Sequence, residues 1–128
     1  MRLVILLSDN DIARAYHAFV VALSAKAIGY EVHVFVSGIG VLVLQKRPKT
    51  RLIGLPWIAR WYIARQLRKM GVKPLEELVQ EALKAGVKIY VDEPAAKMLG
   101  GELIPGVEVA GSLSFLALAK DADLVLTL

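Results

Sequence analysis

The sequence predicts a single α/β domain built on a parallel β-sheet. Short β-branched and aliphatic runs alternate with longer amphipathic segments, and glycine or proline separates most of them. Strands that alternate with helices favour a parallel sheet, because each right-handed crossover places a helix on one face of that sheet. The 128 residues suit one domain and contain neither an internal repeat nor a linker. We therefore expect residues 1–128 to form a three-layer α/β/α sandwich around five parallel strands.

The first half of the chain begins with a buried strand and an amphipathic helix. Residues 3–7 are all apolar, as expected of a parallel strand that is buried on both faces. Ser8 and Asp11 have the form of a capping box, which predicts a helix that opens there and stops at Gly29. Residues 30–37 are β-branched and aromatic, and we expect them to form the second strand.

The second half predicts three more strands and three helices. Pro74 suits the first position of a helix, and Glu76 and Glu77 then lie in its favourable first turn. Helical spacing gives this helix a buried stripe of Leu75, Leu78, Val79, Ala82 and Leu83. The remaining elements, in order, are a strand at 87–91, a helix at 94–99, a strand at 107–110, a helix at 112–120 and a strand at 122–128.

A basic, aromatic insertion at about residues 45–73 interrupts this pattern. From Val32 to Leu75 the chain carries nine Lys or Arg, both tryptophans and no carboxylate, whereas the rest has seven bases and twelve acids. The net charge of +4 is thus +9 in the insertion region and −5 elsewhere. Such a block indicates a surface that meets a partner.

Residues 57–70 within this insertion are predicted to form a helix. It would be about 21 Å long, too short to cross a bilayer. The interaction surface that we expect comprises Trp57, Trp61, Tyr62, Arg65, Arg68 and Lys69. Another subunit or protein is the partner that we favour, an anionic membrane surface is an alternative, and nucleic acid is not expected. A plain solvated face is the remaining interpretation.

Composition excludes several kinds of chemistry. The sequence contains no cysteine, which rules out disulfides, thiolate nucleophiles and zinc sites built on sulfur. Its two histidines, His17 and His33, form no Ser–His–Asp or metal-ligand pattern and are expected to pack rather than to catalyse. We therefore expect no metal and no cofactor, and the sequence favours a binding protein over an enzyme while leaving both open. The first apolar run is too short for a secretory signal, which places the chain in the cytoplasm or at the periphery of a membrane.

Polar residues and glycines follow the predicted strands, where parallel sheets form their functional crevice. The residues expected at this rim are Ser8, Asp9, Asp11, Ser37, Gly38, Gly40, Asp92, Glu93, Gly111 and Ser112. They suit a small anion or nucleotide on helix N-termini, a carboxylate pair, or simple helix caps on a solvated rim. A dinucleotide fingerprint is not favoured, because Val43 occupies the place of its third glycine.

Several segments resemble the DsrE/DsrF-like family of small sulfur-relay proteins. They are the opening strand with Ser8–Asp11, then 27–35, 71–78, 86–89 and 106–111, together with the closing strand. The resemblance covers nearly the whole chain, including the basic insertion found in one branch of the family. It implies a flavodoxin-like five-stranded sheet and assembly into trimers or hexamers.

The resemblance also implies a difference in mechanism. Sulfur-handling members carry persulfide on a cysteine just after the third strand, and Asp92 occupies the matching position here. A carboxylate cannot form a persulfide. We therefore expect a cysteine-free subunit that acts by non-covalent binding in sulfur trafficking, with Asp92 and Glu93 lining the former sulfur pocket. It would form a homo-oligomer or a mixed assembly with a cysteine-bearing relative or a small sulfur carrier.

Overall fold

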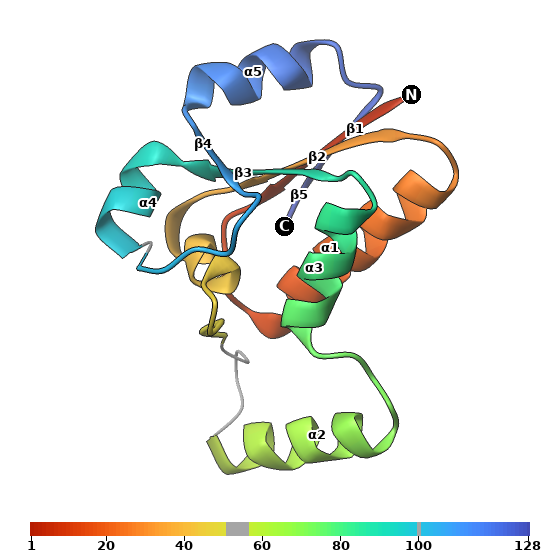
Figure 1. Ribbon diagram of the computed structural model, residues 1–128, viewed down its shortest axis with the longest axis vertical. Coiled ribbons are helices and arrows are strands. Elements are labelled where there is room, and N and C mark those ends of the chain that lie inside the picture. Colours follow the sequence, from red (N-terminus) through yellow and green to blue (C-terminus); the bar gives the residue numbers. More distant parts are fainter. Residues whose placement is uncertain (51–56, 100) are drawn as a thin grey trace.

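The computed structural model describes residues 1–50, 57–99 and 101–128, without the side chains of Trp57 and Arg60. Its elements alternate between strands and helices as the sequence predicts (Figure 1). In chain order they are β1 (Arg2–Leu7), α1 (Ile12–Ala27), β2 (Glu31–Val36), the 3₁₀ helix η1 (Gly38–Leu44), α2 (Trp57–Lys69), α3 (Leu75–Lys84), β3 (Lys88–Asp92), α4 (Glu93–Leu99), β4 (Glu108–Ala110), α5 (Ser112–Lys120) and β5 (Leu124–Thr127).

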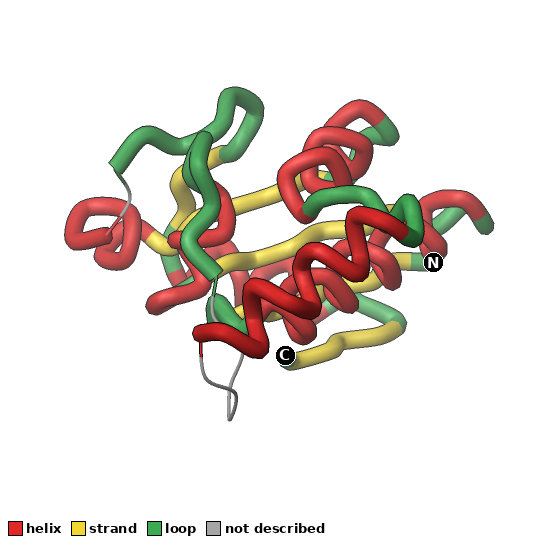
Figure 2. The backbone as a smooth tube through the Cα atoms, turned by 90° about the horizontal axis from the view of Figure 1, so that it is seen from below, coloured by secondary structure: helices red, strands yellow, loops and turns green. Residues whose placement is uncertain are grey.

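The five strands form one parallel sheet in the order β4-β3-β2-β1-β5. The chain winds outward from β1 to β4 and then returns to the opposite side of β1. β5 is therefore an edge strand, and it lies at the outer margin of the sheet beside the C-terminus (Figure 2). This arrangement confirms the α/β class and the five-stranded parallel sheet.

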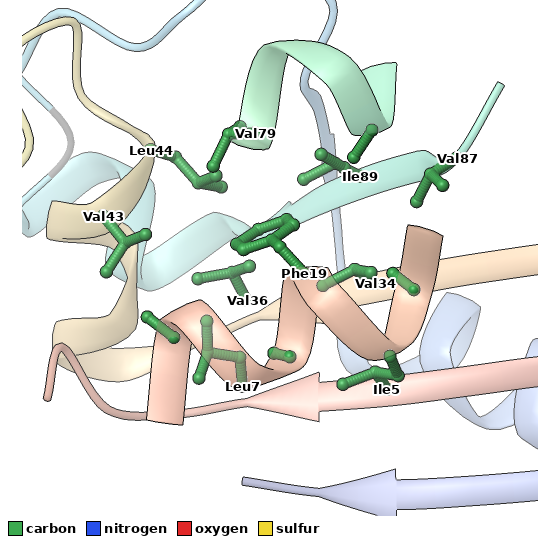
Figure 3. Close-up of a cluster of buried hydrophobic side chains, with 14 of the residues drawn as sticks. Ile5, Leu7, Phe19, Val34, Val36, Val43, Leu44, Val79, Val87 and Ile89 are labelled. Carbon is green, nitrogen blue, oxygen red and sulfur yellow. The ribbon is translucent and has the colours of Figure 1, made fainter. Parts of the chain in front are cut away.

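Helices α1 and α3 cover one face of the sheet and α5 lies on the other (Figure 1). The main core lies under α1 and α3, with the Phe19 ring among side chains from β1, β2, β3 and η1 (Figure 3). β1 and β2 bury successive residues because both of their faces are covered. The stripe predicted for α3 is confirmed, with Leu75, Leu78, Val79 and Ala82 buried and Leu83 partly buried.

The opposite face of the sheet has a thinner cover. Phe35 is buried there, stacked on Tyr90 at 4.8 Å between ring centroids and meeting the edge of the Phe115 ring at 5.4 Å. Within the described chain, however, α5 contributes no buried residue. One copy of the chain thus leaves much of this apolar helix in water.

Two details of the sequence prediction are wrong. Helix α1 begins at Ile12 with Asp11 as its N-cap, and no side chain makes the capping hydrogen bond that Ser8 and Asp11 suggested. The Asp9 carboxylate instead accepts a hydrogen bond from the backbone N–H of Asp11, two residues further along the chain. Pro74 is the N-cap of α3 rather than its first residue.

The end of α1 agrees with the sequence prediction, whereas the helix after β2 was not expected. Gly29 has a φ of +92° and stops α1 as expected, since glycine adopts this left-handed conformation without strain. The 3₁₀ helix η1 was not predicted at all. Gly100, which follows the helix predicted at 94–99, lies outside the described residues. No helix in the described part has the length and apolar character that a membrane span requires.

Candidate functional site at the carboxyl rim of the sheet

The structure places every predicted rim residue at the carboxyl end of a strand or within a few residues beyond it. The turn after β1 holds Ser8–Asp11, and the turn after β2 begins at Ser37. Asp92 is the last residue of β3, and Gly111 follows β4. Because the order of these strands is β4-β3-β2-β1, the four turns form a continuous row along one edge.

The turn after β1 is rich in buried oxygen atoms. Asp9 Oδ1 accepts a hydrogen bond of 2.9 Å from the Asp11 N–H, and Asn10 Nδ2 donates one of 3.1 Å to the Lys49 carbonyl. Asn10 and Asp11 are both buried, and Oδ1 of each lacks a hydrogen-bond partner within the described part of the chain. Unpaired acceptors suit a group that donates hydrogen bonds and disfavour an anion.

The glycines after β2 let η1 pack directly on the end of β1. A Cβ atom at Gly40 would lie 2.9 Å from the Leu7 carbonyl oxygen and 3.3 Å from the Asp9 nitrogen. Gly38 has a φ of +55°, which favours glycine. These two glycines therefore serve close backbone packing, and sequence spacing alone could not distinguish this role from phosphate binding.

Asp92 and Glu93 occupy the junction between β3 and α4. Glu93 pairs with Lys97 one turn along α4, at 3.0 Å. Asp92 is half-buried, and no hydrogen bond or ion pair of the described residues involves its side chain. This leaves the Asp92 carboxylate available for a bound group at the rim.

The structure does not bring the rim carboxylates together as a metal site. β2 lies between β1 and β3, so the ends of these two strands are about 10 Å apart. Among the described residues, no group of three or more His, Asp or Glu side chains has a geometry that could hold a metal ion. Asp9 lies instead 3.9 Å from Arg14 on α1.

Gly111 and Ser112 form the N-terminal end of α5. Gly111 is the N-cap, and its carbonyl accepts the N–H groups of Ser114 and Phe115. A groove lined by Lys46, Glu76, Glu77, Gln80, Glu81, Lys84, Ile104 and Pro105 lies elsewhere, with none of the predicted rim residues among its lining.

A polar network lies on the face of the sheet that α5 covers, and the sequence predicted only part of it. His33 is buried as predicted, with Nδ1 2.9 Å from Tyr90 Oη and Nε2 2.9 Å from Glu31 Oε2. The hydrogen bond from His33 lowers the pKa of Glu31 below its ordinary value of 4.5, and the hydrogen bond from Arg2 lowers it further. Burial raises the pKa of Tyr90 above 10.0. The register that pairs Phe35 with Tyr90 brings these groups together, and no local pattern encodes it.

The predicted interaction surface on α2 is exposed wherever it is described. Trp61, Tyr62, Arg65, Arg68 and Lys69 all face solvent, and the Arg65 guanidinium lies over the Trp61 ring, 5.6 Å from its centroid. The side chain of Trp57 lies outside the described part. His17 on α1 is exposed rather than packed, because it points away from the face that α1 buries.

The sequence model of the DsrE/DsrF-like family matches residues 1–128. The chain belongs to the DsrE/DsrF-like family. It is similar to the sulfur carrier protein DsrE2 of Allochromatium vinosum, with 26% identity over 153 residues that cover 98% of this chain and 96% of the relative. The crystal structure of the ychN protein from E. coli shares the fold, with a TM-score of 0.64 at 14% identity and complete coverage of both chains.

Membership in the DsrE/DsrF-like family confirms the resemblance drawn from the sequence segments, and the shared fold confirms the sheet. Because this DsrE/DsrF-like chain contains no cysteine, no residue at or after the end of β3 has a thiol. The strand ends instead with the carboxylate Asp92, and the carboxylate Glu93 follows it.

Proposed function

We propose that this chain works in sulfur metabolism as a binding subunit that carries no persulfide itself. Its family and the name of its relative, a sulfur carrier protein, support the process. The absence of cysteine supports the mechanism, since only a thiolate attacks a sulfane sulfur to form a persulfide. Such a subunit contributes by holding a partner or a ligand.

Asp92 is the observation that carries this proposal. It ends β3, where the family resemblance expects the sulfur-bearing cysteine, and its half-buried carboxylate has no partner among the described residues. A carboxylate in this place accepts hydrogen bonds from a lysine or arginine of a bound protein. Asp92, with Glu93 beside it, thus converts a reactive position into a docking position for a cationic surface.

The exposed apolar face around α5 and β5 supports assembly with further subunits. We define the α5–β5 face by the exposed side chains of Leu113, Leu116 and Val125. Val125 pairs with Val4 and so points to the α5 side of the sheet. Apolar surfaces of this kind mark protein interfaces. Its occupant is a second copy, giving a trimer or hexamer, or a cysteine-bearing relative in a mixed assembly.

A small anion at the rim is the weaker alternative. Asp9 and Asp11 precede α1, and their negative charge opposes an anion at that helix end. Asp92 and Glu93 oppose it in the same way at α4.

Sulfur loading tests the non-covalent mechanism. The purified chain is incubated with a sulfane donor and its intact mass is measured, together with the Asp92→Cys variant as a matched positive control. We expect no added sulfur on the natural chain and one added sulfur on the variant. A stable covalent sulfur adduct on the natural chain would overturn the mechanism.

Partner capture tests the docking role of Asp92. A cysteine-bearing DsrE-family protein or small sulfur carrier, identified by mass spectrometry in the native complex, is titrated against the natural chain. Asp92→Asn with Glu93→Gln should weaken binding about tenfold, since a charged hydrogen bond is worth about 1.5 kcal/mol or more. Glu76→Gln with Glu102→Gln changes the charge equally away from the rim and should leave the affinity unchanged. Equal losses in both variants would contradict a docking role for Asp92.

A further inference from the structure

One stripe of helix α2 combines aromatic and basic side chains. Positions 58, 61, 62, 65, 68 and 69 follow the three- and four-residue spacing that places residues on one helical face. We define the aromatic–cationic face of α2 as Ile58, Trp61, Tyr62, Arg65, Arg68 and Lys69. The exposed fractions of the first three are 60%, 57% and 58%.

This face has no partner within the described chain. No other described helix or strand packs extensively on α2, which stands apart from the sheet and its covering helices (Figure 1). None of the ion pairs among the described residues involves Arg65, Arg68 or Lys69. The sequence also places no carboxylate anywhere from Val32 to Leu75, so no neighbour along the chain neutralises these cations.

We propose that the aromatic–cationic face docks α2 on the surface of an anionic phospholipid bilayer. Arg65, Arg68 and Lys69 would reach lipid phosphates, while the rings of Trp61 and Tyr62 enter the headgroup layer that such amphipathic rings prefer. A helix of 13 residues, about 20 Å long, lies in the plane of the interface rather than across the membrane. This docking is independent of the proposed role in sulfur metabolism.

The arrangement favours lipid over nucleic acid. The Arg65 guanidinium lies over the Trp61 ring, which leaves a base only the other face of that ring on which to stack. Ile58 offers a polyanion no hydrogen bond, whereas a bilayer rewards its burial. The apolar half of the face comes first along the helix and the cations follow, which suits a tilted insertion of the first turns.

The tryptophans make the docking directly observable. The chain has two tryptophans, Trp57 and Trp61, and both belong to α2, so intrinsic fluorescence reports on this helix alone. The full chain is titrated with phosphatidylcholine vesicles containing phosphatidylglycerol, and with pure phosphatidylcholine vesicles. We expect a blue shift and co-sedimentation with the anionic vesicles only, both weakening as salt is raised.

Matched variants test the contribution of the cations. Each basic residue near an anionic surface contributes about fivefold in affinity, so Arg65→Gln with Arg68→Gln should bind about 30-fold more weakly. Arg65→Lys with Arg68→Lys keeps the charge and should bind like the natural chain. Lys84→Gln with Lys97→Gln removes the same charge from α3 and α4 and should also leave binding unchanged.

Several results would overturn the proposal. One is the absence of a blue shift with anionic vesicles at low salt, and another is equal binding to uncharged vesicles. Emission that is already blue-shifted without lipid, and that depends on protein concentration, would assign α2 to a contact between copies. Quenching by a single-stranded RNA oligonucleotide, with no response to vesicles, would assign it to nucleic acid.

Discussion

Single residues decide the chemistry that this member of the DsrE/DsrF-like family can perform. Asp92 presents a carboxylate at the end of β3, and the sequence contains no cysteine that could supply a thiol. Gly40 acts through its lack of a side chain, because η1 approaches the β1 backbone too closely for a Cβ atom. One residue thus limits reactivity, and the other shapes the rim that surrounds it.

Gly40→Ala should destabilise the fold by about 1–3 kcal/mol, as overpacked substitutions do. The new methyl group would meet the Leu7 carbonyl oxygen at 2.9 Å, and the backbone there cannot yield without disturbing the β1 ladder. Urea unfolding measures the change. Gly111→Ala is the control, since nothing lies within 4 Å of its Cβ position. Its free energy of unfolding should fall by no more than about 1 kcal/mol, because alanine is a poorer N-cap for α5 than glycine. Equal stability of the two variants would show that η1 packs less closely on β1.

Individual elements differ in how far they support the fold. Helix α1 buries five of its residues against the sheet and α3, whereas α2 packs on no described element extensively. Amphipathic helices gain most of their stability from tertiary packing rather than from intrinsic propensity. We therefore expect α2 to open locally without unfolding the sheet.

Matched alanine-to-glycine changes test this difference between elements. Ala22→Gly, at a buried site of α1, should lower the free energy of unfolding by about 1 kcal/mol or more. Ala64→Gly, at an exposed site of α2, should change it by only a few tenths while speeding amide exchange within α2. Urea unfolding and hydrogen exchange give the two readouts. A similar global loss for both would mean that α2 is coupled to the core.

Across the whole molecule, helices bury one face of the sheet more completely than the other. One face of the sheet is closed by α1 and α3, but the α5–β5 face exposes leucine and valine side chains on a helix and on an edge strand. An uncovered edge strand with apolar neighbours favours association. The overall hydrophobic content of 56% and the mean hydropathy of +0.54 are consistent with the assembly that we propose.

Charge substitutions at two equally exposed residues test where assembly occurs. Leu113 on the α5–β5 face is 83% exposed in one copy, and Met98 on α4 is 81% exposed. Leu113→Glu should weaken association at least about tenfold, because the interface loses a buried leucine worth about 1.5–3 kcal/mol and gains a charge. Met98→Glu should assemble like the natural chain. Size-exclusion chromatography with light scattering over a concentration range distinguishes them, and identical behaviour would move the interface elsewhere.

The elements themselves could be predicted from the sequence because their signals are local. Apolar runs, helical spacing and glycine stops act over a few residues, and they located all five strands and the helices α1, α2, α3, α4 and α5. Helix α5 was placed at its observed residues, 112–120. The capping residues of α1 and α3 were misplaced because a serine, an aspartate and a proline can each act at neighbouring positions.

Composition and local periodicity encode the strand–helix alternation, the cationic insertion and the absence of thiol chemistry, so these features follow from the amino-acid sequence. Tertiary structure alone decided that η1 closes on β1 through Gly40, that His33 meets Tyr90, and that the α5–β5 face stays open. These features depend on strand order and register, which join residues far apart in the chain. Long-range packing selects such contacts, and no short segment carries enough information to specify them.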